Sequence, residues 1–444
     1  MNIRAPLFLG PVAIWCFGTL PARAQIVDSP DGSVADLPVN YTEAKSGTYT
    51  LPDPLKLASG QAVTEAKTWF EKRRPELFKL IEENQFGRAP ARPAALSFDV
   101  FDRDTSAFDG KARRRQVTIY FTASRTEHYV DVLLYVPANA TGPVPVLLQF
   151  NWTANNLAVA AADPGVKVGR IWNAAEKQRV PAVPTNDSAR GVGRNLNVMR
   201  VLERGFALAV FNYIDIEPDV LDANAQGIRA ASLQPGQKSP APDEWGAIAA
   251  WSWGASRIID YLETDPQINA KRIAIMGVSR LGKAVLWAAA CDERVAGVIA
   301  SCSGEGGAAL SRRNYGETVA HLVAPTRYPY QFARNYQKWA GPMIDAPFDA
   351  HLLVALIAPR AVLLQTGTTD KWSDPYGEFL AAKAATPVFA LLGKKGIEAD
   401  SLSAPGQPLL NTLGYLMHDG PHGMLPGDWP VCLDFLQLHL KVGR

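Results

Sequence analysis

The apolar residues of the chain fall into short continuous runs that alternate with longer segments of helical spacing. Val144–Phe150, with the sequence VPVLLQF, is one such run, and a run of this kind is typical of a strand buried on both faces. Further strand-like runs lie at Ala95–Phe101, Arg115–Phe121, Tyr129–Val136, Ala207–Phe211, Arg272–Met276, Val295–Ala300 and Ala361–Gln365. Helical spacing is found at Leu196–Arg204, Glu244–Leu262, Gly282–Ala290 and Pro430–Lys441. Strands that alternate with helices predict an α/β fold of three layers, in which helices cover both faces of a mostly parallel central sheet.

The first 24 residues have the pattern of an export signal. Met1–Arg4 is positively charged, Leu7–Leu20 is mostly apolar, and Ala22 and Ala24 supply the small residues that a signal peptidase requires. The apolar run contains a proline and is too short to span a bilayer comfortably. We therefore expect residues 1–24 to be a signal peptide and the protein to be secreted or periplasmic.

The remaining chain shows no internal repeat and no linker rich in serine or glycine. We predict that residues 25–444 form a single catalytic domain with an N-terminal extension over about 25–110, in which Ala62–Asn84 has helical spacing. With 47% hydrophobic and 20% charged residues, the chain can bury a large core and is not disordered.

Charge and cysteine usage exclude several classes of function. The formal net charge is +2, and both surplus charges, Arg4 and Arg23, lie in the predicted leader, so no broad positive field for nucleic acid remains. Cys291, Cys302 and Cys432 follow the leader without a C-x-x-C pair, which disfavours a disulfide framework and a zinc ribbon. The chain also lacks the H-E-x-x-H motif of metalloproteases. We expect no metal, no cofactor, no membrane or nucleic-acid partner, and a monomer.

The strongest local signal for catalysis is Arg272–Lys283, RIAIMGVSRLGK. Its apolar first half predicts a strand, Ser279 follows directly, and a helix opens near Gly282. A sharp strand-to-helix turn exposes a serine hydroxyl at the end of a parallel sheet and aims the next backbone N–H at a developing oxyanion. The common pattern is G-x-S-x-G, and here the second glycine comes one residue late. A serine at an ordinary turn is the alternative, but the flanking strand and helix favour a nucleophile.

A serine nucleophile needs a base and an acid, which in an α/β-hydrolase follow in the order Ser, acid, His. His422 lies in a turn before the last helical segment, where such a fold places its base, and we prefer it to His418. Asp370 comes just after the last strand-like run and is our predicted acid. Asp374 is the alternative, although it also suits a turn because a proline follows it.

The segment GVSRLGK around Ser279 resembles the G-x-S-R-x-G-K signature of the glucuronoyl esterases of carbohydrate esterase family 15, particularly the bacterial members. Five further blocks read like the family, in order along most of the chain: Asp243–Leu262, Ser303–Glu317, Pro347–Arg360, Thr369–Glu378 and Asp428–Phe435. The resemblance implies an α/β-hydrolase fold and the activity of a 4-O-methyl-glucuronoyl methylesterase.

The resemblance also implies roles for individual residues beyond Ser279 and His422. Arg280 would help to stabilise the oxyanion, and Lys283 would hydrogen-bond hydroxyls of the glucuronate ring. Glu317 and Trp372 match positions that contact the sugar. Each has an ordinary alternative: Lys283 as a solvated helix residue, Glu317 as a surface salt-bridge partner and Trp372 as a core aromatic.

The sequence departs from the family pattern at two places. Many members carry a glutamate where this chain has Cys302, and because a neutral thiol cannot stabilise an imidazolium, Asp370, which matches a carboxylate of bacterial relatives, becomes the acid. Fungal members have a disulfide between positions that are Val278 and Gly423 here, so that bridge is absent.

We therefore predict a secreted serine esterase that cleaves esters of (4-O-methyl-)glucuronic acid, as found between glucuronoxylan and lignin alcohols. One rival is an acetyl-xylan-type deacetylating esterase of the same fold, and Arg280 and Lys283 favour the uronate substrate over it. The other rival is a non-catalytic glycan-binding protein, suggested by Cys302; the retained serine, histidine and aspartate argue against it.

Overall fold

The computed structural model describes residues 26–159, 162–183, 196–221, 226–341 and 343–441. The predicted signal peptide, residues 1–24, lies outside the described residues. Within them, none of the helices combines the length and the apolar character that crossing a bilayer requires.

A nine-stranded sheet forms the centre of the molecule, in the order β13-β12-β11-β10-β6-β9-β5-β4-β3. The pairs from β13 to β9 are parallel, and the pairs from β9 to β3 are antiparallel. The strands are β1 (Gly32–Val34), β2 (Leu37–Val39), β3 (Ser97–Ala107), β4 (Ala112–Tyr120), β5 (Tyr129–Pro137), β6 (Val144–Asn151), β7 (Arg170–Asn173), β8 (Gln178–Pro181), β9 (Ala207–Asn212), β10 (Ile268–Val278), β11 (Val295–Ser301), β12 (Ala361–Gly367) and β13 (Leu413–His418). The predicted mostly parallel sheet is confirmed.

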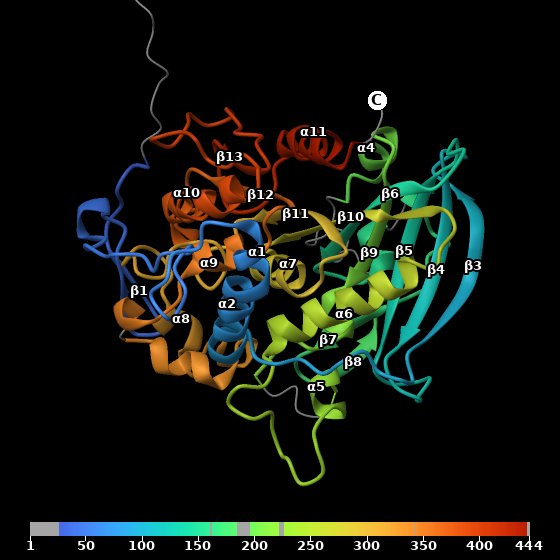
Figure 1. Ribbon diagram of the computed structural model, residues 1–444. Coiled ribbons are helices and arrows are strands. Elements are labelled where there is room, and N and C mark those ends of the chain that lie inside the picture. Colours follow the sequence, from blue (N-terminus) through green and yellow to red (C-terminus); the bar gives the residue numbers. More distant parts are fainter. Residues whose placement is uncertain (1–25, 160–161, 184–195, 222–225, 342, 442–444) are drawn as a thin grey trace, which may run out of the picture.

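Helices cover both faces of this sheet. They are α1 (Ala66–Thr68), α2 (Arg74–Ile81), α3 (Asn155–Val159), α4 (Val198–Glu203), α5 (Ile228–Ala231), α6 (Ala247–Leu262), α7 (Arg280–Cys291), α8 (Val319–Val323), α9 (Ala350–Ala355), α10 (Pro375–Leu391) and α11 (Asp428–Leu440). Figure 1 shows α6 and α7 in front of the sheet and α4 and α11 along its upper side. The predicted three-layer α/β architecture is therefore confirmed.

The alternation of side chains along the strands explains the two covered faces. On β6, Val146 and Leu148 join the core beneath α6 and α7, whereas Leu147 joins the core beneath α4 and α11. Successive strand residues point to opposite faces, so a strand that is apolar at every position needs a cover on each side. This is the physical reason that continuous apolar runs predicted a buried sheet.

The N-terminal extension packs against the segment that precedes α8. Arg313 forms an ion pair with Glu43 at 2.8 Å, and the backbone N–H groups of Asn314 and Gly316 donate to the carbonyls of Ser46 and Asn40. Figure 1 shows this N-terminal arm, in blue, beside the orange segment. The predicted helix over Ala62–Asn84 is found as α1 and α2 with the π-helical turns that flank α2.

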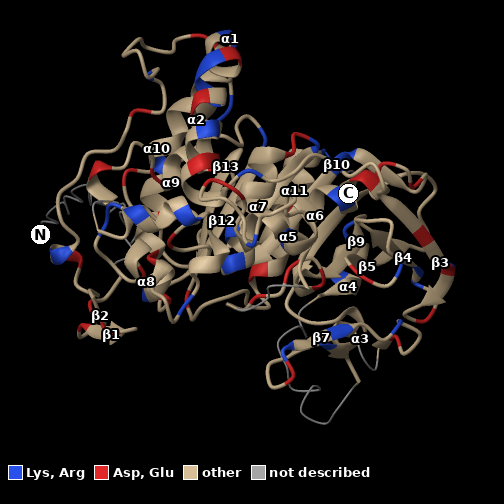
Figure 2. Ribbon diagram, turned by 90° about the horizontal axis from the view of Figure 1, so that it is seen from below, with Lys and Arg blue, Asp and Glu red and all other residues tan. Residues whose placement is uncertain are grey.

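Positive and negative residues are mixed over the described chain. Figure 2 shows Lys and Arg interspersed with Asp and Glu along the ribbon, as the near balance of the two kinds of charge in the sequence leads one to expect. The three cysteines of the described residues are free thiols.

Candidate active site

The predicted nucleophile, acid and base follow three parallel strands of one half of the sheet. Ser279 comes directly after β10, Asp370 follows β12, and His422 follows β13. The carboxyl ends of parallel strands meet at one edge, which is where open α/β sheets hold their ligands. Between β10 and β12 lies β11, and the residue after its end is Cys302.

Ser279 occupies a strained turn. Its backbone has φ 60° and ψ −128°, and its N–H donates to the carbonyl of Ser301 at 2.8 Å. Two glycines make this sharp turn feasible. A Cβ at Gly277 would lie 2.3 Å from the Leu281 carbonyl oxygen, and one at Gly282 would lie 2.9 Å from that of Ser301. The late second glycine of the motif therefore lets α7 approach the end of β11.

His422 and Asp370 form a directed pair. Nδ1 of His422 lies 2.7 Å from Oδ2 of Asp370. The imidazole is 41% exposed, whereas the carboxylate is 4% exposed. Burial acts to raise the pKa of Asp370, but the hydrogen bond and the charge of His422 outweigh it, so this pKa lies below its ordinary value. The pair thus combines an accessible imidazole with an anionic group that fixes its orientation.

The alternative base, His418, is engaged elsewhere. Its Nδ1 lies 2.7 Å from Asp428, and its Nε2 lies 2.8 Å from the carbonyl oxygen of Pro421. Both nitrogens therefore have partners within the fold, and the ring is buried. A histidine held in this way supports the turn that carries His422.

The alternative acid, Asp374, has a structural role. It pairs with Arg313 at 2.8 Å and accepts the backbone N–H of Gly377 at 2.9 Å as the N-cap of α10. An aspartate at this place stabilises the first turn of a helix. Its carboxylate is thereby committed to Arg313 and α10.

Arg280, the first residue of α7, is held by Asp219, an acid with a side chain that is 8% exposed and that belongs to no sequence motif. Its guanidinium lies 2.5 Å from Oδ2 of Asp219. The same carboxylate accepts hydrogen bonds from the hydroxyl of Tyr330 and the amide of Gln331, both at 2.7 Å, and from the hydroxyl of Tyr213 at 2.8 Å. Asp219 is therefore a fixed anchor for a side chain beside the nucleophile.

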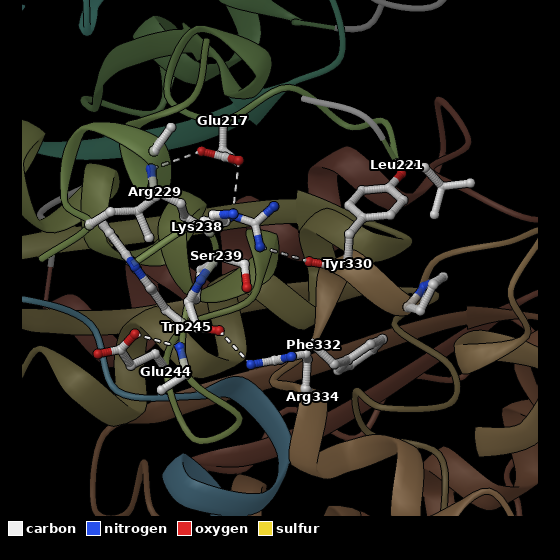
Figure 3. A pocket seen from close by; sticks show the side chains of 15 residues that line it. Glu217, Leu221, Arg229, Lys238, Ser239, Glu244, Trp245, Tyr330, Phe332 and Arg334 are labelled. Atoms are coloured by element: carbon white, nitrogen blue, oxygen red, sulfur yellow. Dashed lines mark hydrogen bonds and ion pairs between the residues drawn. The ribbon is translucent and has the colours of Figure 1, made fainter. Parts of the chain in front are cut away.

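Tyr330, which donates to Asp219, also lines a pocket of about 190 Å³, and Figure 3 shows hydrogen bonds and ion pairs between the residues of its walls. Glu217 forms an ion pair with Arg229 at 2.9 Å, and Arg229 donates to the backbone carbonyl of Tyr330 at 3.2 Å. These bonds hold the segment that contains Tyr330 and Gln331, whose side chains contact Asp219. The pocket walls thus support the position of Arg280 indirectly.

Lys283 and Glu317 are both buried, and Lys283 lies one helical turn after Ser279, the predicted nucleophile. Lys283 is 4% exposed, so it is not a solvated helix residue; burial lowers its pKa and the charge of Glu317 offsets part of that effect. Burial raises the pKa of Glu317, and the charges of Lys283 and Arg327 oppose this. Glu317 forms an ion pair with Arg327 at 2.8 Å. The positive charges of Lys283 and Arg327 and the negative charge of Glu317 thus lie close together.

Aromatic rings border this charged region. Trp372 is half-buried, and its indole lies 5.1 Å from the guanidinium of Arg327. The ring of Tyr328 lies 4.4 Å from the guanidinium of Arg280 and 4.9 Å from that of Arg327. Aromatic rings beside a few buried polar groups are the combination that holds a small-molecule ligand in a defined orientation. Neither Tyr328 nor Arg327 belongs to a motif that could have singled it out.

The arrangement is suited to acyl transfer, and the comparisons with known proteins agree with that chemistry. A family profile described as "Glucuronyl esterase, fungi" matches residues 238–393. A carbohydrate esterase of an unknown prokaryotic organism is 38% identical over 94% of this chain and 96% of its own length. A 4-O-methyl-glucuronoyl methylesterase of Cerrena unicolor is 28% identical over 84% of this chain and 67% of its own length.

Comparisons with solved structures identify the fold. A glucuronoyl esterase from Solibacter usitatus superposes with a TM-score of 0.85, is 41% identical, and covers 90% of this chain and 100% of its own. A glucuronoyl esterase of carbohydrate esterase family 15 from Teredinibacter turnerae T7901 has a TM-score of 0.77 at 32% identity and covers 94% of this chain and 96% of its own. The predicted α/β-hydrolase fold is confirmed.

Proposed function

The chain belongs to the glucuronoyl esterases of carbohydrate esterase family 15, and from this premise we propose that it hydrolyses esters of (4-O-methyl-)D-glucuronic acid through Ser279, His422 and Asp370. As a glucuronoyl esterase it is a carboxylic ester hydrolase. The residues that perform the reaction and the natural ester are the parts that we propose.

The reaction begins with the hydroxyl of Ser279. Its oxygen attacks the C6 carbonyl of the glucuronate ester while Nε2 of His422 takes the proton. Asp370 keeps Nδ1 protonated and stabilises the imidazolium that forms. The imidazolium then protonates the departing alcohol, which leaves a glucuronoyl ester on Ser279.

Water completes the cycle. His422 deprotonates a water molecule that attacks the same carbonyl, and Ser279 recovers its proton as the glucuronate departs. In both halves the tetrahedral oxyanion lies beside Arg280, whose guanidinium is held by Asp219 at 2.5 Å. A donor fixed before the charge develops stabilises a transition state without further reorganisation.

Three residues around the nucleophile provide sugar contacts in this proposal. Lys283 donates hydrogen bonds to ring hydroxyls, and Glu317 accepts hydrogen bonds from them. The partly exposed indole of Trp372 packs on the apolar face of the pyranose. The ion pair between Glu317 and Arg327 holds the carboxylate in place. These contacts favour a uronate in the acyl position over an acetyl group.

The observation that supports this proposal most directly is the 2.7 Å contact between His422 and Asp370, formed by an exposed imidazole and a buried carboxylate. In this pair Asp370 is the acid of the proposed triad, a role that the neutral thiol of Cys302 cannot fill. The natural substrate in this proposal is the ester between glucuronoxylan and lignin alcohols. The protein acts on it as a monomer, after residues 1–24 have directed it out of the cytoplasm.

A substrate comparison tests the proposal. Purified chain is offered benzyl D-glucuronate and acetylated xylan in parallel, and Ser279→Ala is the control. We expect rapid release of benzyl alcohol, slow or no release of acetate, and no activity in the variant. A preference for acetate would point to a deacetylating esterase. Glycan binding without hydrolysis of either ester would point to a non-catalytic protein.

A further inference from the structure

The thiol of Cys302 lies against the pair formed by His422 and Asp370. One ligand atom from each of the three residues, a sulfur, an imidazole nitrogen and a carboxylate oxygen, can be chosen so that all lie within 4.8 Å of one another. The thiol also meets the backbone N–H of Gly423 at 3.3 Å. The reaction described above makes no use of this sulfur.

These three groups form a donor set of one particular kind. Thiolate, imidazole and carboxylate are the ligands that proteins offer to Zn²⁺, and three protein ligands with a fourth position open to water are typical of accessible zinc sites. Hard cations such as Mg²⁺ prefer oxygen ligands alone. The chemistry of the cluster therefore selects a borderline-soft divalent cation.

The surroundings allow a cation to reach the cluster. Asp370 and Cys302 are buried, 6% and 1% exposed, but the imidazole of His422 is 41% exposed and forms the outer wall. The hydroxyl of Ser373 lies 3.3 Å from Nδ1 of His422, so the nitrogen that faces Asp370 has polar neighbours. The exposed imidazole of His422 is therefore the ligand of the cluster that is most accessible from solvent.

We propose that Cys302, Asp370 and His422 form an inhibitory zinc site inside the catalytic centre. The inference rests on the proposed function, because the site shares two members of the proposed triad. Zinc binds the sulfur of Cys302, an oxygen of Asp370 and Nδ1 of His422, with water in the fourth position.

The proton balance explains the inhibition. The thiol of Cys302 loses its proton to water as the Zn–S bond forms. Zinc displaces the proton on Nδ1 of His422 to water, and the ring takes up one proton from water at Nε2, so the imidazole stays neutral and only the thiol proton is released overall. In this tautomer Nε2 is a donor and cannot accept the proton of Ser279. Chelation of the zinc restores the active tautomer.

Inhibition and zinc binding are measured separately. Hydrolysis of benzyl D-glucuronate is followed as ZnCl₂ is added, and then after addition of excess EDTA. We expect inhibition that EDTA reverses and that MgCl₂ does not reproduce. Cys302→Ala and Cys302→Ser are expected to keep the parent activity and to need at least about tenfold more zinc for half-inhibition, since even the loss of an outer-shell partner costs a metal site about tenfold or more in affinity.

A control thiol and a direct readout complete the test. Cys291→Ala, which removes an exposed thiol at the end of α7, should leave the zinc response unchanged. X-ray absorption of zinc-loaded Ser279→Ala should show one sulfur ligand at about 2.3 Å. Zinc inhibition of equal strength in Cys302→Ala, or a zinc shell without sulfur, would overturn the site. A sulfur-ligated zinc in a chain that hydrolyses no glucuronate ester would instead overturn the proposed function and leave the metal site standing.

Discussion

At the scale of single residues, two histidines that each contact an aspartate differ in what surrounds them. His418 is buried with both ring nitrogens engaged, whereas His422 uses Nδ1 for Asp370 and its imidazole is 41% exposed. The sequence predicted His422 in a turn before the last helix, and it lies between β13 and α11; this much follows from the sequence because chain order and turn composition are local properties. It could not show that His418 supports that turn, because the role depends on Asp428 and Pro421.

The anchor of Arg280 could not be predicted from the sequence for the same reason. Asp219 belongs to no motif, and two of its hydrogen-bond donors, Tyr330 and Gln331, lie 111 and 112 residues away along the chain, whereas Tyr213 lies six residues before it. Only the folded chain brings them around one carboxylate. A residue of this kind is found by its contacts and not by its spacing.

Loss of the charge on Asp219 should affect turnover more than binding. In Asp219→Asn the guanidinium of Arg280 loses its ionic partner, so we expect kcat to fall by about tenfold to a hundredfold, less than the loss of an oxyanion donor itself can cost. KM should change much less. Steady-state kinetics with benzyl D-glucuronate measure both constants. Tyr330→Phe, which removes one of the donors to Asp219, is the milder control, and a change confined to KM would contradict the positioning role.

At the scale of elements, the strands that the sequence predicted have continuous apolar runs, and the helices that it predicted have apolar residues at helical spacing. The strand β13 and the helix α10 were not predicted. β13, with the sequence LGYLMH, has its apolar residues interrupted by Gly414, so it lacks a continuous apolar run such as that of β6. α10 contains Pro387 within the helix, and a proline inside a helix removes a backbone hydrogen bond and usually breaks the helical pattern. Packing of α10 on β12 and β13 outweighs that local preference.

A buried glutamate in α10 should make stability depend on pH. Glu378 accepts hydrogen bonds from Ser303 and Gly304, and burial raises its pKa from 4.5 to about 8. Between these values the folded chain keeps a proton that the unfolded chain has released. The free energy of unfolding therefore falls as pH rises through this window, by at most about 1.4 kcal/mol per pH unit for this group.

Glu378→Gln tests this dependence because glutamine imitates the protonated acid. We expect the Tm of the variant to exceed that of the parent near pH 9 by more than it does near pH 5. Thermal unfolding followed by circular dichroism at the two pH values gives the comparison. An equal difference at both would mean that Glu378 is ionised in the folded chain throughout.

At the scale of the whole molecule, the N-terminal extension and the sheet share one core. Leu57, Trp69 and Phe86 of the extension lie in the same apolar cluster as Val146 of β6 and Leu364 of β12. The ion pair between Glu43 and Arg313 adds a polar link close to Glu317. Composition alone indicated a large core, but it could not show which segments contribute to it.

We therefore expect residues 25–444 to unfold as a single cooperative unit. Scanning calorimetry should give one peak, and esterase activity should be lost over the same temperature range. A shared core leaves no boundary along which part of the chain can unfold alone. Two resolved transitions, with activity surviving the first, would show that the extension is a separate domain.

The central claim is that Asp370, and no other carboxylate, directs His422. It is tested by kcat for benzyl D-glucuronate in two matched variants, Asp370→Asn and Asp428→Asn, each of which neutralises the acid of one His–Asp pair. We expect a loss of about 10⁴-fold for Asp370→Asn, because the wrong tautomer of His422 is then favoured, and a loss below about tenfold for folded Asp428→Asn. A parent-like kcat in Asp370→Asn, or equal losses in the two variants, would contradict it.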